Sequence, residues 1–210
     1  MDLTVPDPSL VLLIGIAGCG KSSFARRHFA PTEVLSSDEC RAMVADDPND
    51  QSATSDAFSV LRFVLDKRLK RQRLTVVDAT SLDRDARKPY LGLARKYDVP
   101  AVAIVLDLPL DVCLERDRRR SDRTVGEEVL RRQRRDLERG LRQLDGESYL
   151  AVQVLGAPEV VDRVRIARVP LVRSVAAADE AEVDSSTPYA VSDNDLSDSS
   201  SGPASRGGAP

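Results

Sequence analysis

The sequence predicts an α/β fold in which a parallel sheet of five strands is covered by helices on both faces. Three observations support this prediction. Short apolar runs recur along the chain without the polar alternation of a half-exposed strand, as buried parallel strands require. Helical patterns lie between these runs, which is the order of a doubly wound sheet. A glycine-rich motif that ends in Lys-Ser follows the first long apolar run, where such folds turn from a strand into a helix.

The five apolar runs predict strands at residues 11–16, 34–36, 74–79, 101–107 and 151–156. The helical patterns between them predict helices at residues 21–29, 52–73, 83–97, 109–119 and 125–146. The second of these helices has an apolar stripe at helical spacing, formed by Ala53, Ala57, Val60, Leu61, Val64, Leu65 and Leu69. We interpret this stripe as a face that packs on the core.

The charge pattern of residues 174–210 differs from that of the rest of the chain. Residues 174–210 contain nine serines, seven acidic residues and one basic residue, Arg206, and few large apolar groups. Such a segment cannot bury enough apolar surface to offset the entropy of ordering, so we expect a disordered tail. The net charge of −3 for the whole chain therefore becomes +3 over residues 1–173. We expect a short N-terminal extension at 1–9, one mildly cationic domain at 10–173, and the tail.

Composition favours a cytoplasmic protein. The longest apolar stretch, LVLLIGIA at residues 10–17, is much shorter than the roughly 20 residues that a membrane span requires. The N-terminus is acidic, which is not typical of a secretory signal. Cys19, Cys40 and Cys113 share no metal-ligand spacing and are odd in number, which favours a reducing compartment over a disulfide framework.

The segment GIAGCGKS at residues 15–22 matches the phosphate-loop pattern G-x-x-x-x-G-K-[ST]. Its glycines let backbone N–H groups turn toward phosphate oxygens, and the helix that follows favours an anion at its first turn. Its lysine places a positive charge on the β- and γ-phosphates of ATP, and its serine hydroxyl can ligate Mg²⁺. The candidate ATP-binding residues are Gly15, Gly18, Cys19, Gly20, Lys21, Ser22 and Ser23.

This motif predicts a P-loop NTPase fold. We expect the small Cys19 side chain to face outward, with sensitivity of the loop to oxidation as the alternative. The chain lacks the N-K-x-D motif of GTPases, whereas a kinase needs a group that deprotonates an acceptor hydroxyl and cations that clamp the moving phosphoryl group.

Two carboxylates follow predicted strands and are candidates for this chemistry. Because the carboxyl ends of parallel strands lie along one edge of a sheet, the strand at 34–36 brings Asp38 to the edge that holds Lys21. Asp38 is therefore our candidate for receiving the proton. Asp78 ends the next strand, and we consider two roles for it: a Mg²⁺-side group near Ser22, or a structural partner of Thr80.

A simpler interpretation of the segment VLSSDECR at residues 34–41 is the start of a helix. Ser37 would then cap the first turn, and Asp38 would interact favourably with the positive end of the helix dipole. Arg41 would point into water. The only histidine, His28, lies about two turns into the helix after the phosphate loop and is interpreted as a packing residue.

Candidate phosphate-clamping cations come from CLERDRRRSDRTV at residues 113–125. Arg116 and Arg120 are four residues apart and share a helix face, and Arg123 follows a Ser-Asp turn. This arrangement is typical of a basic helical lid above the phosphates. Its alternative is a solvated arginine-rich face, which we favour for Arg118 and Arg119.

Together these segments resemble the 5′-hydroxyl polynucleotide kinase module of the bacterial RNA-repair kinase-phosphatase family, an AAA-like P-loop phosphotransferase. The motifs that carry the resemblance are GIAGCGKSSFARRHF, VLSSDECRAMVADDPNDQSATSDAFSVL, LTVVDATSLDRDARKPYLGLA and VAIVLDLPLDVCLERDRRRSDR, and the likeness spans about residues 10–170. Two positions depart from the family pattern: Ser81 replaces the usual Asn after DAT, and Cys19 replaces the usual Ser.

The resemblance implies transfer of the γ-phosphate of ATP to the 5′-hydroxyl end of RNA or DNA, with Mg²⁺ as cofactor. It implies that Asp38 is the general base and that Arg41 grips a phosphate of the acceptor strand. It also implies that Arg116, Arg120 and Arg123 contact ATP.

The family's other activities have no sequence signature here. With one histidine and no K-x-D-G motif, the chain cannot build a binuclear phosphatase or a ligase site, so separate proteins would supply those steps. Two other functions use the same motifs: a small-molecule kinase on this scaffold, and a non-catalytic ATP-binding switch.

Overall fold

The computed structural model describes residues 2–120 and 124–171, and the tail expected at 174–210 lies outside them. The strands are β1 (Asp2–Asp7), β2 (Leu10–Ile14), β3 (Val34–Ser36), β4 (Thr75–Asp78), β5 (Ala101–Leu106), β6 (Ala151–Leu155) and β7 (Arg165–Pro170). The helices are α1 (Lys21–His28), α2 (Ser37–Ala45), α3 (Thr54–Lys70), α4 (Arg84–Lys96), α5 (Leu110–Arg118), α6 (Glu127–Leu141) and α7 (Pro158–Arg163). Short 3-10 turns cover Pro31–Glu33, Gln51–Ala53 and Leu144–Gly146. None of the helices in the described ranges is long and apolar enough to cross a membrane.

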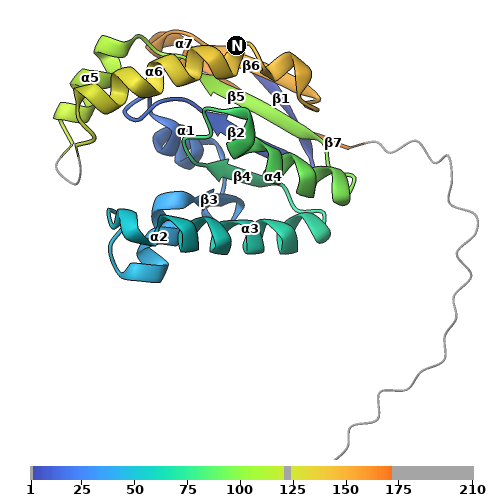
Figure 1. The fold of residues 1–210 in the computed structure, drawn as a ribbon. Helices are drawn as coiled ribbons and strands as arrows, with labels where there is room; N and C mark the ends of the chain where they lie inside the picture. The colour runs from blue at the N-terminus through green and yellow to red at the C-terminus, as the bar shows by residue number, and fades with distance from the viewer. Residues whose placement is uncertain (1, 121–123, 172–210) are drawn as a thin grey trace, which may run out of the picture. The chain divides into compact units, whose positions relative to one another are not determined.

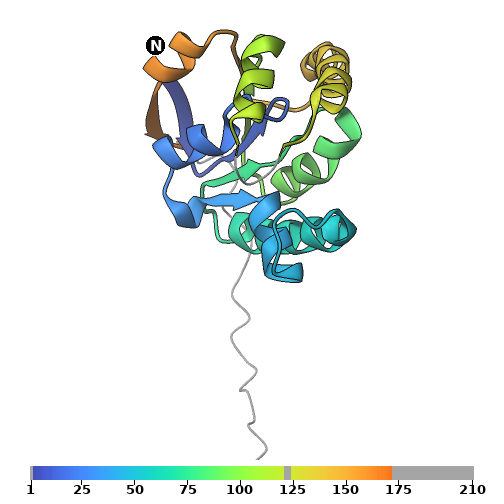
Figure 2. The same ribbon diagram turned by 90° about the vertical axis from the view of Figure 1, so that its left-hand side faces the viewer.

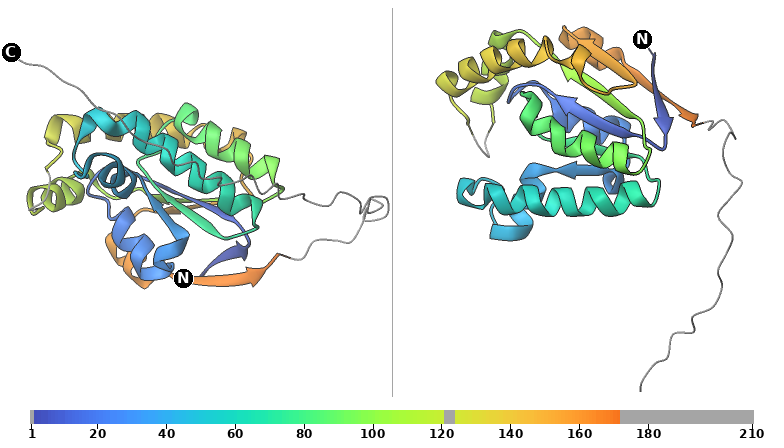
Figure 3. Two further views of the ribbon diagram at one scale, coloured as in Figure 1. Left: turned by 90° about the horizontal axis from the view of Figure 1, so that it is seen from below. Right: turned by 45° about the vertical axis from the view of Figure 1, so that its right-hand side comes forward.

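The predicted parallel sheet of five strands is confirmed. Its order is β3-β4-β2-β5-β6, and every neighbouring pair is parallel. All residues of β2, β4 and β5 are buried, which explains why their apolar runs lack alternation. In Figure 2, α1 and α7 lie on one side of the sheet, whereas α3, α4 and α6 lie on the other. The view from below in Figure 3 shows α3 and α4 side by side across one face.

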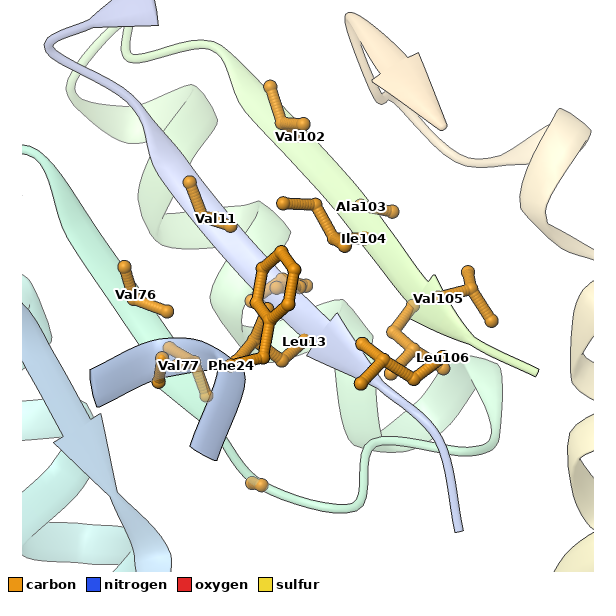
Figure 4. Close-up of a cluster of buried hydrophobic side chains, with 14 of the residues drawn as sticks. Val11, Leu13, Phe24, Val76, Val77, Val102, Ala103, Ile104, Val105 and Leu106 are labelled. Atoms are coloured by element: carbon orange, nitrogen blue, oxygen red, sulfur yellow. The ribbon is translucent and has the colours of Figure 1, made fainter. Parts of the chain in front are cut away.

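The core forms where the helices meet the central strands. Figure 4 shows Phe24 of α1 lying over the apolar side chains of β2 and its neighbours, among them Val11, Leu13 and Val76. On the other face, α3 buries the predicted apolar stripe through Ala57, Leu61, Leu65 and Leu69. The apolar stripe at helical spacing therefore predicted the buried face of α3 correctly.

A second, two-stranded sheet was not predicted. Residues 2–7, which we expected to belong to an extension, form β1, and β1 pairs in parallel with β7 in the register Asp2 to Arg165. Leu3 and Val5 of β1 are buried, but β7 has no buried residue. Because β7 is exposed and rich in arginine, its sequence carries neither a buried-strand run nor a clear alternation.

The carboxyl ends of the central strands point to one edge of the sheet. In Figure 1 the arrowheads of β2 and β5 face the side on which α5 lies. The end of β4 and the loops and helices that follow β2, β3 and β5 at this edge contain the predicted functional residues that the structure describes.

Candidate functional site

The phosphate-loop motif lies where the sequence predicts it, between β2 and α1. Gly18 and Gly20 have φ values of 74° and 97°, in the left-handed region that glycine adopts without strain. Gly20 precedes α1 and provides no capping side chain, so the first-turn N–H groups are left for another acceptor. A Cβ at Gly18 would lie 2.5 Å from the carbonyl oxygen of Cys113, so the loop packs tightly against α5. These features suit the binding of an anion.

Lys21 lies over this loop. Its Nζ donates hydrogen bonds to the carbonyl oxygens of Gly15 and Ile16, both at 2.9 Å. Ser22 is half-buried and Ser23 is exposed, both in the first turn of α1. The ammonium group is therefore held at the loop that precedes α1.

Cys19 does not face outward as expected. Its side chain is fully buried, and a Cβ at Gly15 would lie 2.6 Å from its Sγ. The thiol fills the space that Gly15 leaves open, and for this reason it turns inward. Cys113 on α5 is also buried, and burial is the main cause that raises the pKa of its thiol to about 12. A thiol with such a pKa is a packing group rather than a nucleophile.

The segment after β3 holds Asp38 and Arg41 together. Ser36, not Ser37, caps α2: its Oγ accepts from the N–H groups of Asp38 at 3.3 Å and Glu39 at 3.4 Å. The cap lies one residue earlier than predicted because Ser36 has extended dihedrals and Ser37 is already helical.

Arg41 does not point into water. Its side chain is only 6% exposed, and Nη1 donates to Asp38 Oδ1 at 2.6 Å and to the carbonyl oxygen of Pro48 at 2.8 Å. The Asp38 side chain is 50% exposed. A buried guanidinium thus binds a carboxylate that remains open to solvent. The start of a helix does not need such an ion pair.

Asp78 lies between the phosphate-loop strand and the strand that leads to Asp38. Its Cα is in register with Leu13 of β2 on one side and with Ser36 of β3 on the other. Asp78 is buried, and within residues 2–120 and 124–171 its carboxylate forms no hydrogen bond or ion pair. A hydrogen bond to Thr80, one of the two roles considered for Asp78, is therefore not present.

The basic segment over the loop is only partly described. Arg116 on α5 donates from Nη1 to the carbonyl oxygen of Cys19 at 3.3 Å, so this arginine reaches the phosphate loop. Arg120 is exposed just beyond α5, and Arg123 lies outside the described residues. Arg118 and Arg119 are exposed and form ion pairs with Glu127 and Glu115, as expected of a solvated face.

Three residues of this region were not predicted from the sequence. Asp117 is buried and accepts hydrogen bonds from the N–H groups of Val125, at 3.0 Å, and Gly126, at 3.1 Å, which ties the start of α6 to α5. Gln133 of α6 accepts a hydrogen bond from the N–H group of Ala17 in the phosphate loop. Arg134 pairs with Asp107 after β5 at 2.5 Å. Each of these side chains contacts another segment of the chain, and the arginine-rich sequence around them gives no signal of such contacts.

His28 has the packing role that the sequence indicates. Its ring lies 4.5 Å from that of Phe24, and partial burial with the nearby charge of Arg27 lowers its pKa. It is the last residue of α1, at the end of the helix that is farther from the phosphate loop.

Comparisons with known proteins agree with this fold. Residues 10–140 match the family described as an AAA domain. No match is found among curated proteins. The chain is similar to one chain of the Pnkp1/Rnl/Hen1 RNA repair complex, with 20% identity and a TM-score of 0.58 over 68% of this chain and 48% of that chain. It therefore spans about half the length of that relative.

Two further solved structures are similar. The AvrRxo1-ORF1:-ORF2 complex has 17% identity and a TM-score of 0.51, with 71% of this chain and 55% of that chain covered. A gluconokinase from Sinorhizobium meliloti 1021 has 18% identity and a TM-score of 0.47, with 75% and 90% covered. At these identities the similarity to the repair complex and to AvrRxo1-ORF1:-ORF2 concerns the fold.

Proposed function

Because this chain belongs to the AAA domain family, with a P-loop kinase-like fold, we propose that it is an ATP-dependent polynucleotide 5′-kinase. The enzyme would transfer the γ-phosphate of ATP to the 5′-hydroxyl end of RNA or DNA. The observation that carries the proposal is the Asp38–Arg41 pair, which follows β3 at the same edge of the sheet as the phosphate loop. A half-exposed carboxylate held by a buried arginine is suited to accept a proton from an alcohol.

The donor side of the proposed reaction rests on the phosphate loop. Lys21 and the first-turn N–H groups of α1 would bind the triphosphate of ATP. Arg116 of α5 would neutralise charge on the phosphoryl group that is transferred. We propose that Arg120 contacts ATP from the same side, and the contact of Arg123 with ATP stays a prediction from the sequence. Such clamping arginines are worth roughly 10³–10⁵ in rate in related phosphoryl transfers.

The oxygen donors near the loop fit Mg²⁺. Asp78 supplies a buried carboxylate with no partner among the described residues, and Ser22 supplies a hydroxyl in the first turn of α1. Hard oxygen ligands of this kind, with phosphate oxygens, are what Mg²⁺ prefers. When bound, the ion would neutralise charge on the phosphates of ATP.

The acceptor side of the proposal rests on Asp38 and Arg41. Asp38 would take the proton of the 5′-hydroxyl as its oxygen attacks the γ-phosphorus and the bond to ADP breaks. Arg41 keeps the carboxylate in place through its 2.6 Å contact. We also assign to Arg41 a contact with a phosphate of the acceptor strand; its Nε is buried and has no hydrogen-bond partner among the described residues.

The similarity to the RNA repair complex supports a polynucleotide acceptor. That complex contains Pnkp1 with Rnl and Hen1, and this chain would cover about half of its matched relative. We infer that separate proteins provide any phosphatase or ligase step, and that the enzyme acts in the cytoplasm.

One assay tests the proposal. The chain is incubated with γ-labelled ATP, Mg²⁺ and a 5′-hydroxyl oligonucleotide, with the 5′-phosphorylated oligonucleotide as control. We expect label on the 5′-hydroxyl strand alone. Label on a small alcohol and none on the strand would favour the small-molecule kinase, and ATP binding without transfer would favour the switch.

Replacement of the proposed base tests the mechanism. We expect Asp38→Ala to retain ATP binding and to lose about 10²–10⁴ in transfer rate, because a general base is absent. Glu39→Ala is the matched control, since Glu39 is exposed in the same first turn of α2. Transfer by Asp38→Ala at the rate of Glu39→Ala would refute the assignment.

Replacement of Arg41 separates its two proposed contacts. We expect Arg41→Ala to raise KM for the oligonucleotide more than KM for ATP, because the arginine lies on the acceptor side. An equal effect on both KM values would count against that assignment.

A further inference from the structure

Gln133 joins α6 to the phosphate loop. Its Oε1 accepts a hydrogen bond of 2.8 Å from the N–H group of Ala17, a contact between residues 116 positions apart. Because the partner is an N–H donor, the carboxamide oxygen must face the loop. The Nε2 atom then faces away from Ala17 N, and it donates no hydrogen bond to any residue in the described part of the chain.

The helix that carries Gln133 is fixed at the carboxyl edge of the sheet. Arg134 pairs with Asp107 at 2.5 Å and donates to the carbonyl oxygen of Leu108 at 3.3 Å, both just after β5. Further along α6, Gly140 packs directly against the carbonyl oxygen of Leu82, where no Cβ fits. These contacts hold Gln133 in place by means other than its own hydrogen bond.

The contact involves the same peptide group that binds Lys21, because Ala17 N–H and the Ile16 carbonyl belong to one peptide. Ala17 directly follows Gly15 and Ile16, whose carbonyl oxygens are 2.9 Å from the Lys21 Nζ. The lysine of this motif reaches the β- and γ-phosphates. The carboxamide of Gln133 is therefore beside the peptide that holds the γ-phosphate-binding lysine.

We propose that Gln133 is a specificity-determining residue that distinguishes ATP from ADP. Its oxygen fixes the loop at Ala17, and its NH₂ group donates to an oxygen of the γ-phosphate, which ADP lacks. This inference rests on the ATP site of the proposed function and adds a residue to it that the phosphate-loop motif does not contain.

Equilibrium binding of the full chain, with Mg²⁺ and without an oligonucleotide, tests the inference. The probes are ADP and a non-hydrolysable ATP analogue. Gln133→Glu keeps an oxygen for the Ala17 N–H group but replaces the NH₂ donor with a carboxylate oxygen that repels phosphate. Gln133→Ala removes both. Gln143→Glu is the matched control, because Gln143 is exposed just after α6 and adds the same charge.

We expect Gln133→Glu to weaken binding of the ATP analogue about tenfold or more, since a hydrogen bond to a charged group is lost and repulsion is added. Binding of ADP should change by less than about threefold, and Gln143→Glu should bind both nucleotides as the wild type does. Gln133→Ala should show a smaller loss for the analogue than Gln133→Glu.

Either of two results with Gln133→Glu would overturn the inference. If Gln133→Glu binds the analogue like the wild type, or loses ADP and the analogue equally, Gln133 does not recognise the γ-phosphate. A wild-type chain that binds nucleotide but phosphorylates no oligonucleotide would refute the proposed acceptor and leave this test valid. A wild-type chain that binds neither nucleotide would refute both proposals.

Discussion

The buried ion pair between Arg87 of α4 and Glu147 connects the edge of the candidate site to the segment that follows α6. The Arg87 side chain is 0% exposed and that of Glu147 is 3% exposed. The guanidinium donates to Glu147 through Nη2 at 2.5 Å and Nε at 2.9 Å. It also donates to the carbonyl oxygens of Ser81 at 3.0 Å, Leu82 at 2.7 Å and Gly140 at 3.4 Å. One side chain thus fixes the loop after Asp78 to the end of α6.

Replacement of Arg87 by Met should destabilise the fold strongly. It keeps most of the side-chain volume but leaves the Glu147 carboxylate buried without its partner, together with carbonyl oxygens that lose a donor. Removal of one member of a buried ion pair costs about 3–5 kcal/mol. In a domain of this size each kcal/mol lowers Tm by about 2–4 °C, so we expect a fall of about 6–20 °C.

Thermal unfolding followed by circular dichroism measures this effect. Arg95→Met is the matched control, because Arg95 is an exposed arginine on the same helix, and its Tm should change by less than about 2 °C. In Arg87→Met/Glu147→Met neither charge is left unpaired, so the double variant should lose less stability than the two single variants together. If Arg87→Met unfolds like Arg95→Met, or if the single effects simply add, the pair does not hold the loop as described.

Two more predictions concern the loop and the surface. Gly18→Ala places a Cβ 2.5 Å from the carbonyl oxygen of Cys113 at a φ of 74°, so it should weaken ATP binding about tenfold or more. Gly146→Ala is the control, because its Cβ meets no atom within 4 Å, and it should not weaken ATP binding. Equal affinity of the two variants in a titration with ATP would contradict this prediction. The hydrogen bonds from Tyr97 and Lys96 lower the pKa of Asp66 to about 2, below its usual 3.8. The ionised Asp66 carboxylate therefore stabilises the fold above pH 4, and this stabilisation is lost as the pH falls toward 2. Asp66→Asn should therefore lower Tm at pH 7 and lower it less at pH 3, and a Tm difference that is independent of pH would refute the role of this carboxylate.

Local patterns in the sequence were sufficient for the main sheet and the phosphate loop. Buried parallel strands need apolar side chains on both faces, so β2, β4 and β5 appear as unbroken apolar runs. The loop at residues 15–22 needs glycine at fixed positions because the backbone itself faces the anion. The topology of a parallel sheet then brought Asp38 and Asp78 to one edge, and the register of Ser36 with Asp78 agrees with that prediction.

Only the tertiary structure determined how these residues are held. Cys19 turns inward because Gly15 leaves room for its thiol, and Arg41 is buried because the chain at Pro48 folds back over it. Gln133 meets Ala17, and β1 meets β7, across most of the length of the described chain. Such contacts depend on which distant surfaces pack together, and neither hydrophobic periodicity nor motif spacing records that choice, because both describe only neighbours along the chain.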